Sequence, residues 1–214
     1  MKNAIIIGAS SGIGRQIAKL LVKENYRVVI TGRRFELLNE IVQMNPSSYI
    51  AKQIDINDTT NSIKILEQIA IELGKIDLVV LSSGTGDINE GLDYQIEKQT
   101  IDTNVSGFTA IVGWAFNQFK SQGNGHLASI TSIAGLRGNR SAPAYNATKA
   151  YQINYLEGLR QKAKNLHLPI HITDIRPGFV DTQMAKGDGL FWVASPEKAA
   201  RQIIWAIRKY KRVV

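Results

Sequence analysis

The sequence predicts an α/β fold in which a single doubly wound parallel sheet carries helices on both faces. Short apolar runs alternate with longer helical stretches along the chain, and the runs are apolar on both faces, as buried parallel strands are. A glycine-rich segment joins the first apolar run to the first helical stretch. The chain has 214 residues, of which 44% are hydrophobic and 21% charged, so we expect one globular domain over residues 1–214.

The first half of the chain shows three strand–helix units. NAIIIG (3–8) is a buried apolar run, and the following SGIGRQIAKLLVKEN has apolar residues at helical spacing. RVVIT (27–31) is the second strand, and a helix follows from about residue 34 to 44. YIAKQID (49–55) is the third strand, and Gly74 closes the helix after it.

The second half repeats the alternation with longer helices. IDLVVLSS (76–83) is the fourth strand, and a helical region in one or two pieces runs from roughly 93 to 122. GHLASITS (125–132) and IHITDIR (170–176) are the fifth and sixth strands, separated by a helix over 144–166. Ser195 and Pro196 begin the last helix as cap and first-turn proline. Trp114 and Trp205 fall within helical patterns and are expected in the core.

The composition of the chain argues against several classes of protein, namely disulfide-bonded, secreted, membrane-spanning and metal-binding proteins. The chain has no cysteine, which excludes disulfides and thiolate metal sites and fits a reducing compartment. No run approaches about 18 apolar residues, and the apolar start is too short for a signal peptide. We therefore expect a cytoplasmic protein with no membrane segment. The three histidines share no metal-ligand spacing, so no metal site is expected.

The formal net charge is +8, and residues 196–214 carry six Lys or Arg against one Glu. These basic residues fit either a solvated helix end, where they suit the helix dipole, or a binding patch. We favour the solvated helix end and expect no nucleic-acid partner.

Ligands of doubly wound sheets bind beyond the carboxyl ends of the strands, so the residues after each strand matter most. GASSGIG follows the first strand, and its glycines allow backbone N–H groups to approach a phosphate at the start of the next helix. Simple turn chemistry is the alternative. The residues expected at the cofactor here are Gly8, Ser10, Ser11, Gly12, Ile13 and Gly14.

TGRR follows the second strand, where an acidic residue would hold the ribose 2′-hydroxyl of NAD. Gly32 stands there instead, and Arg33 and Arg34 offer planar donors suited to a 2′-phosphate. The sequence therefore predicts NADP, with NADPH preferred to NADH. Two solvated arginines are the alternative, more strongly for Arg34 than for Arg33.

The third and fourth strands supply further candidates for the cofactor site. Asp55, followed by Ile56, can accept from an adenine amino group, or can cap the next helix. Ser83 and Gly84 are small residues past which a ligand can run.

Two tyrosine–lysine pairs have a spacing of four, which places each pair one helical turn apart. They are Tyr94 with Lys98 and Tyr145 with Lys149. Ser132 ends the fifth strand thirteen residues before Tyr145 and delivers a hydroxyl to the same edge, whereas Tyr94 has no such partner. Tyr145 and Lys149 are therefore the expected catalytic pair.

These motifs together resemble the short-chain dehydrogenase/reductase family, a Rossmann-type family, along nearly the whole chain. YNATK is similar to its Tyr-x-x-x-Lys motif, SITSIAG to its serine segment, and RPGFVDT to the segment beside the nicotinamide. LSSG stands where the family commonly has Asn-Asn-Ala-Gly. The resemblance implies the catalytic set Asn104, Ser132, Tyr145 and Lys149. It also implies cofactor contacts from Asn104, Tyr145, Lys149, Pro177, Gly178, Val180 and Thr182.

The implied activity is hydride transfer between NADP(H) and a carbonyl or alcohol substrate. Tyr145 would exchange a proton with the substrate oxygen, its pKa lowered by the nearby ammonium and a cationic nicotinamide. Ser132 would orient that oxygen, Lys149 would hold the ribose, and the Asn104 side chain would hold a water linking Lys149 to solvent. The alternative is a non-catalytic NADP(H)-binding sensor or scaffold, which has no need of the four residues together.

Three further expectations concern the end of the chain and its assembly. Residues 183–194 combine glycines with large apolar residues and form either a lid over an apolar substrate or an ordinary connection. The terminal RVV is a short version of the family's seventh strand. Family subunits meet through helices matching residues 102–122 and 144–165, so we expect a homodimer.

Overall fold

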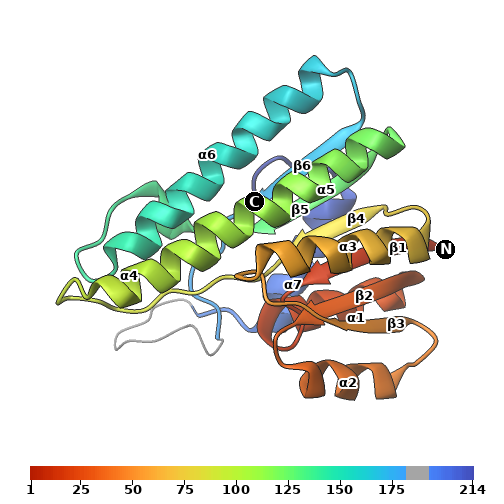
Figure 1. The fold of residues 1–214 in the computed structure, drawn as a ribbon, viewed down its shortest axis with the longest axis horizontal. Coiled ribbons are helices and arrows are strands. Elements are labelled where there is room, and N and C mark those ends of the chain that lie inside the picture. Colours follow the sequence, from red (N-terminus) through yellow and green to blue (C-terminus); the bar gives the residue numbers. More distant parts are fainter. Residues whose placement is uncertain (182–192) are drawn as a thin grey trace.

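The computed structural model describes residues 1–181 and 193–214. Its centre is a six-stranded, fully parallel sheet with the strand order β3-β2-β1-β4-β5-β6 (Figure 1). Ile7, the last residue of β1, pairs with Thr31 of β2 and Leu81 of β4, so the carboxyl ends of the central strands lie together. The strands are β1 (Lys2–Ile7), β2 (Tyr26–Gly32), β3 (Tyr49–Gln53), β4 (Leu78–Leu81), β5 (Gly125–Ile130) and β6 (Ile170–Ile175).

Helices cover both faces of the sheet, as the sequence predicts, and each face has its own core. Alternate residues of β1 point to opposite faces: Ile5 and Ile7 pack with α3, α5 and α6, whereas Ala4 and Ile6 pack with α1, α2 and α7. The helices are α1 (Gly12–Lys23), α2 (Phe35–Met44), α3 (Thr59–Leu73), α4 (Tyr94–Ile101), α5 (Phe108–Gln122), α6 (Pro143–Asn165) and α7 (Pro196–Arg208). No helix among the described residues is long and apolar enough to span a bilayer.

The helical region after β4 contains the largest departure from a regular pattern. Between α4 and α5 the backbone widens into a π-helix, Asp102–Gly107, without leaving the helix axis. Single π turns inside α-helices are often found at functional sites because they alter which backbone groups are paired. Asn104 lies inside this turn.

The last residues of the chain extend the sheet by a rudiment of a seventh strand. Val213 forms a parallel bridge with Asp174 of β6, and Arg176 N–H donates to the Val214 carbonyl at 2.7 Å. The expectation for RVV therefore agrees with the backbone pairing.

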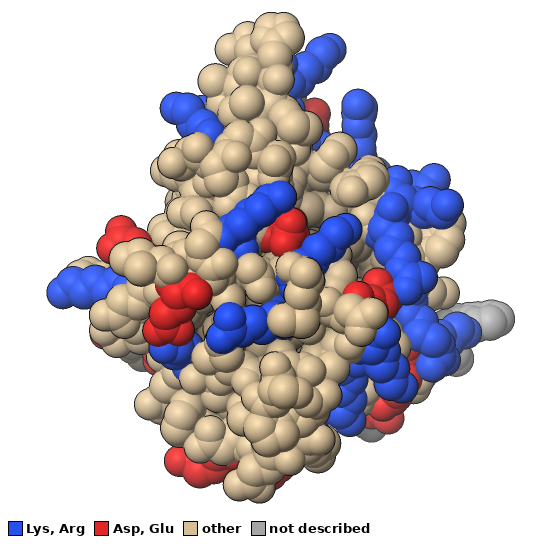
Figure 2. Space-filling model, turned by 90° about the vertical axis from the view of Figure 1, so that its right-hand side faces the viewer, with Lys and Arg blue, Asp and Glu red and all other residues tan. Residues whose placement is uncertain are grey.

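The basic end of the chain, residues 196–214, contains α7, and the apolar face of this helix is buried against α1. Arg208 Nε donates to a carboxylate oxygen of Glu24 on α1 at 3.0 Å. Trp205 is 52% exposed with the Lys211 ammonium 5.6 Å from its ring centroid, so its predicted core position was wrong. Its position on α7 faces away from the sheet, whereas Trp114 on α5 does pack against the core. Figure 2 shows Lys and Arg gathered along one side of the face that carries the N-terminus.

Candidate active site

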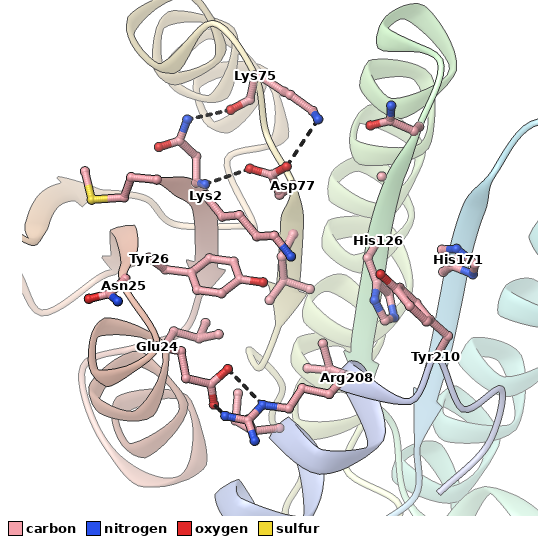
Figure 3. Close-up of a pocket in the computed structure, with 18 of the residues that line it drawn as sticks. Lys2, Glu24, Asn25, Tyr26, Lys75, Asp77, His126, His171, Arg208 and Tyr210 are labelled. Carbon is pink, nitrogen blue, oxygen red and sulfur yellow. Dashed lines mark hydrogen bonds and ion pairs between the residues drawn. The ribbon is translucent and has the colours of Figure 1, made fainter.

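The two edges of the sheet offer different environments for a ligand. A hollow of about 820 Å³ lies at the amino ends of the strands, beside Lys2, Asp77, His126 and His171 (Figure 3). Its carboxylates are already engaged: Asp77 accepts from Asn3 N–H at 2.8 Å, and Glu24 pairs with Arg208. Burial lowers the pKa of His126 to about 3, with His171 as a second cause, so His126 is neutral. The predicted catalytic residues lie at the opposite, carboxyl edge, which is the usual ligand edge of such sheets.

The glycine-rich turn after β1 brings strand and helix into close contact. Gly8 has a φ of +90°, and the N–H groups of Gly8 and Ala9 donate to the Thr31 carbonyl at 3.0 and 2.8 Å. A Cβ at Gly14 would overlap the Gly8 carbonyl oxygen. Ser11 is the N-cap of α1, and its hydroxyl makes no capping bond. The first N–H groups of α1 thus lie beside this turn at the carboxyl edge of the sheet, without a side-chain cap from Ser11.

The arginines after β2 have different roles in the structure. Arg34 donates to the hydroxyls of Ser10 and Ser11 at 3.0 and 2.7 Å, so it crosses to the glycine-rich turn. Arg33 is exposed, and its backbone carbonyl accepts from Gln53 at 2.9 Å. Gly32 faces Ser10, with 3.5 Å between the Ser10 hydroxyl and a Cβ built on the glycine. Arg34, less favoured from the sequence, is the arginine that contacts the turn.

The residues after β3 and β4 also lie at this edge. Asp58, not Asp55, caps α3, because its carboxylate accepts from Asn61 N–H at 3.1 Å. Asp55 is exposed to solvent. The Ile56 side chain is buried in the core, which leaves only its backbone for a ligand. Ser83 packs against Gly8, and Gly84 faces the Lys149 ammonium, which would lie 3.4 Å from a Cβ there.

Ser132, Tyr145 and Lys149 converge at the end of β5, as predicted. Ser132 follows the strand and caps a short 3-10 turn, its hydroxyl accepting from Ala134 N–H at 3.0 Å. The hydroxyl of the same serine acts on the Tyr145 phenol and favours its ionised form. The Lys149 ammonium lies 5.7 Å from the centre of the Tyr145 ring. A Cβ at Gly86 would overlap that ring, so the chain after β4 lies directly against it.

The protein surroundings of Tyr145 raise its pKa rather than lower it. Burial is the larger cause, and the Ser132 hydroxyl opposes it. The expected lowering by Lys149 is absent because the ammonium lies beside the ring and its hydrogen bonds go elsewhere. Its acceptors are the Ile130 carbonyl at 3.2 Å and the Gln152 amide oxygen at 3.1 Å. Burial lowers the pKa of Lys149 itself to about 8, partly offset by Asp174.

Both polar atoms of the Asn104 side chain bind neighbouring protein groups. Its amide oxygen accepts from Thr85 N–H at 2.9 Å, and its amide nitrogen donates to the Thr85 carbonyl and, at 3.1 Å, to the Thr148 hydroxyl. The amide therefore braces the chain after β4 against α6. The Phe108 N–H, which would pair with the Asn104 carbonyl in a regular helix, donates to the Thr103 and Val105 carbonyls, and the Asn104 carbonyl accepts from Gln152 at 2.9 Å.

Sequence reasoning missed Gln152, which connects Lys149 to the π-helix. The sequence did contain a signal for it. Gln152 lies three residues after Lys149, on the face of the helix whose other positions, such as Leu156, are buried. A polar residue at a core position calls for a hydrogen-bonding partner.

The second tyrosine–lysine pair lies in a different environment. Tyr94 begins α4 and is 68% exposed, and Lys98 pairs with Asp102 one turn later. Charge pairing on a solvated helix thus accounts for this spacing.

The segment after β6 runs beside the serine turn. The Pro177 carbonyl accepts from Ile133 N–H at 3.2 Å, and Gly178 faces Ile133. Val180 is buried and bridges to Ala194. Thr182 and the greater part of the proposed lid, up to residue 192, lie outside the described residues. Within the described ranges, no group of three or more His, Cys, Asp or Glu could hold a metal ion.

Comparison with known proteins identifies the family. The model described as short chain dehydrogenase matches residues 2–189. The chain is 31% identical over 209 residues to an uncharacterized oxidoreductase of Staphylococcus haemolyticus, covering 95% of this chain and 90% of the relative. An uncharacterized oxidoreductase of Staphylococcus aureus strain USA300 is 32% identical over 219 residues, with coverage of 99% and 93%.

Solved structures share the fold. A short-chain dehydrogenase from Streptomyces avermitilis has a TM-score of 0.89 at 24% identity, covering 100% of this chain and 87% of the other. ElxO with NADP bound has a TM-score of 0.87 at 23% identity, with coverage of 100% and 96%. The family match over most of the chain and the relatives above 30% identity lead to one conclusion: the chain belongs to the short-chain dehydrogenase/reductase family of oxidoreductases.

Proposed function

We propose that this protein is an NADP(H)-dependent reductase of a carbonyl, or dehydrogenase of the corresponding alcohol, with cofactor and catalytic residues in one domain of residues 1–214. The observation that carries the proposal is the convergence of Ser132, Tyr145 and Lys149 at the carboxyl edge, where the Ser132 hydroxyl acts on the Tyr145 phenol and the Lys149 ammonium lies 5.7 Å from the centre of the tyrosine ring. We also propose that it is cytoplasmic. The chain has no cysteine and so forms no disulfide that would need an oxidising compartment.

The chain's own residues would bind the cofactor and move one proton. When bound, the nicotinamide supplies or accepts the hydride. The turn at Gly8–Gly14 would hold the pyrophosphate, and Lys149 would donate to the ribose. Tyr145 would donate its phenolic proton to the substrate oxygen in reduction and accept it back in oxidation. Ser132 would donate to that oxygen and fix its direction, and Pro177, Gly178, Val180 and Thr182 would line the nicotinamide side.

The test is a screen of purified protein against a panel of carbonyls with NADPH and alcohols with NADP, followed by nicotinamide absorbance. Turnover of a carbonyl or alcohol supports the proposal. Tight NADPH binding without turnover on any compound would favour the sensor or scaffold instead.

Cofactor choice gives a second test, in which Arg33→Ala should weaken NADPH binding about ten- to hundredfold and leave NADH almost unchanged. A charge-assisted hydrogen bond to the 2′-phosphate is worth roughly 1.5–3 kcal/mol, and about 1.4 kcal/mol is a factor of ten. Ser11, a neutral residue, keeps the preference moderate. Fluorescence titration of both cofactors measures the effect.

Arg34→Ala is the matched comparison for that variant. Because Arg34 contacts Ser10 and Ser11 in the turn, its loss should weaken both cofactors. An equal loss for NADPH and NADH in Arg33→Ala would mean that Arg33 supports the loop rather than recognising the phosphate.

We propose that the protein is a homodimer assembled through α5 and α6. The outer surface of these helices carries an exposed aromatic group: Tyr151 lies beside Tyr155 and hydrogen-bonds Thr109 across the two helices at 2.9 Å. Sedimentation at micromolar concentration should give the dimer mass, and Tyr151→Glu should shift it toward monomer. A monomer for the unmodified protein would contradict the proposal.

A further inference from the structure

Gln152 lies at the centre of the site but is not one of the residues assigned to the reaction. It is 1% exposed and lies on α6, between Lys149 and the π-helix. Its amide oxygen accepts from the Lys149 ammonium at 3.1 Å, and its amide nitrogen donates to the Asn104 carbonyl at 2.9 Å. An ammonium only donates and a carbonyl only accepts, so one orientation of the amide satisfies both neighbours.

The Gln152 amide is one of few groups that bind the buried ammonium of Lys149. Among the described residues, its hydrogen-bond acceptors are the Ile130 carbonyl and the Gln152 amide, both uncharged. Two titratable groups lie near the ammonium, one on the same helix and one on the sheet. Tyr145 lies one turn earlier on α6, and Asp174 of β6 raises its pKa from a distance while its own carboxylate accepts from Arg176 at 2.7 Å.

We propose that Gln152 is a positioning residue: it ties the Lys149 ammonium to the Asn104 carbonyl, and so holds Lys149 charged and directed toward Tyr145 and the cofactor ribose. This inference deepens the proposed function and rests on it. The π-helix favours this tie, because the Phe108 N–H, which a regular helix would direct to the Asn104 carbonyl, donates to the Thr103 and Val105 carbonyls.

The chemical role of Gln152 is to hold the lysine and not to carry protons. The hydrogens of a neutral amide are not acidic in the working range, so Gln152 passes none between Lys149 and Asn104. Its oxygen favours the charged form of Lys149, since a hydrogen bond to an ionised form stabilises that form. Removing the oxygen should therefore lower the pKa of Lys149, and replacing the amide with a carboxylate should raise it.

The experiment measures the pKa of Lys149 directly. Protein labelled with ¹³C at lysine Cε is titrated by NMR, and the Lys149 resonance is identified by its loss in Lys149→Arg. Gln152→Met keeps the side-chain length and removes both hydrogen bonds, so it should lower the pKa of Lys149 by about one unit. Gln161→Met, the same substitution at an exposed position of α6, should leave that pKa unchanged.

Gln152→Glu is a second variant, and it should shift the pKa of Lys149 in the opposite direction. Its carboxylate should raise the pKa of Lys149 by about one unit or more. An unchanged pKa in Gln152→Met would overturn the proposal even if that variant were less stable, because a residue that only fills space does not shift a titration. Should Gln152→Met fail to fold, an unchanged pKa in Gln152→Glu would overturn it equally.

This test does not depend on finding the substrate. The titration needs neither cofactor nor turnover, so the proposed function can fail in the panel assay while the Lys149 pKa still responds to Gln152. In active enzyme, the pH profile of kcat/KM should change in Gln152→Met and stay as in the unmodified protein in Gln161→Met.

Discussion

Replacing Tyr145 with phenylalanine is expected to lower kcat at least about a hundredfold, because positioned acid–base groups contribute typically 10²–10⁴-fold. The substitution removes the phenolic proton and keeps the ring that packs against Gly86. NADPH affinity should change far less, by no more than about tenfold, since one neutral hydrogen bond contributes roughly 0.5–1.5 kcal/mol. Turnover is followed by nicotinamide absorbance on the best substrate of the panel, and binding by NADPH fluorescence.

Tyr94→Phe is the control for this result. Tyr94 has the same spacing to a lysine, but it is exposed at the start of α4, where Lys98 pairs with Asp102. The variant should match the unmodified protein in both turnover and binding. Comparable damage from both substitutions would mean that the wrong tyrosine–lysine pair has been identified.

The order and type of the regular elements could be predicted because they depend on local patterning. Buried strands give apolar runs, and a helix such as α1 repeats its buried residues at helical spacing. Ser195 caps α7, with its hydroxyl accepting from Lys198 N–H at 3.2 Å, since capping is also local. The cluster of Ser132, Tyr145 and Lys149 followed from the rule that parallel strands present their carboxyl ends at one edge.

The partners of the polar side chains could not be predicted, because they depend on contacts between distant segments. Asn104 meets Thr85 and Thr148, which lie 19 and 44 residues away, and Gln152 meets a carbonyl 48 residues away. The π-helix could not be located from the apolar pattern, which allowed either one or two helical pieces between residues 93 and 122. Asp55 was the cap that the sequence suggested for α3, and the backbone geometry gives that role to Asp58.

Lys149 carries a cost in stability that follows from the same burial. It is 3% exposed, and burial lowers its pKa from 10.5 to about 8. Below pH 8 both the folded and the unfolded chain carry the charge, and the folded state bears the whole cost of burying it. Between about pH 8 and 10.5 the unfolded chain binds more protons than the folded chain, so stability rises with pH as this cost is lost.

Lys149→Met removes the titrating ammonium, so comparing the variant with the unmodified protein should reveal how Lys149 contributes to the pH dependence of stability. The free energy of unfolding of the variant minus that of the unmodified protein should fall by roughly 3 kcal/mol between pH 7 and 10.5, at about 1.4 kcal/mol per pKa unit. The difference at pH 7 alone is a weaker test, because methionine leaves the Gln152 and Ile130 oxygens without their donor, at about 1–3 kcal/mol each. Comparing the same difference across pH cancels that cost, together with every other titrating group that the two proteins share.

Urea unfolding of both proteins at intervals from pH 7 to 10.5 measures the effect, with Lys120→Met as the matched substitution at an exposed position of α5. The Lys120 difference should stay constant with pH, since its ammonium remains in water in both states. A constant difference for Lys149→Met as well would mean that the pKa of Lys149 is the same in the folded and the unfolded chain. The hydrogen bonds that its ammonium donates to the Ile130 and Gln152 oxygens would then offset the whole cost of burying the charge.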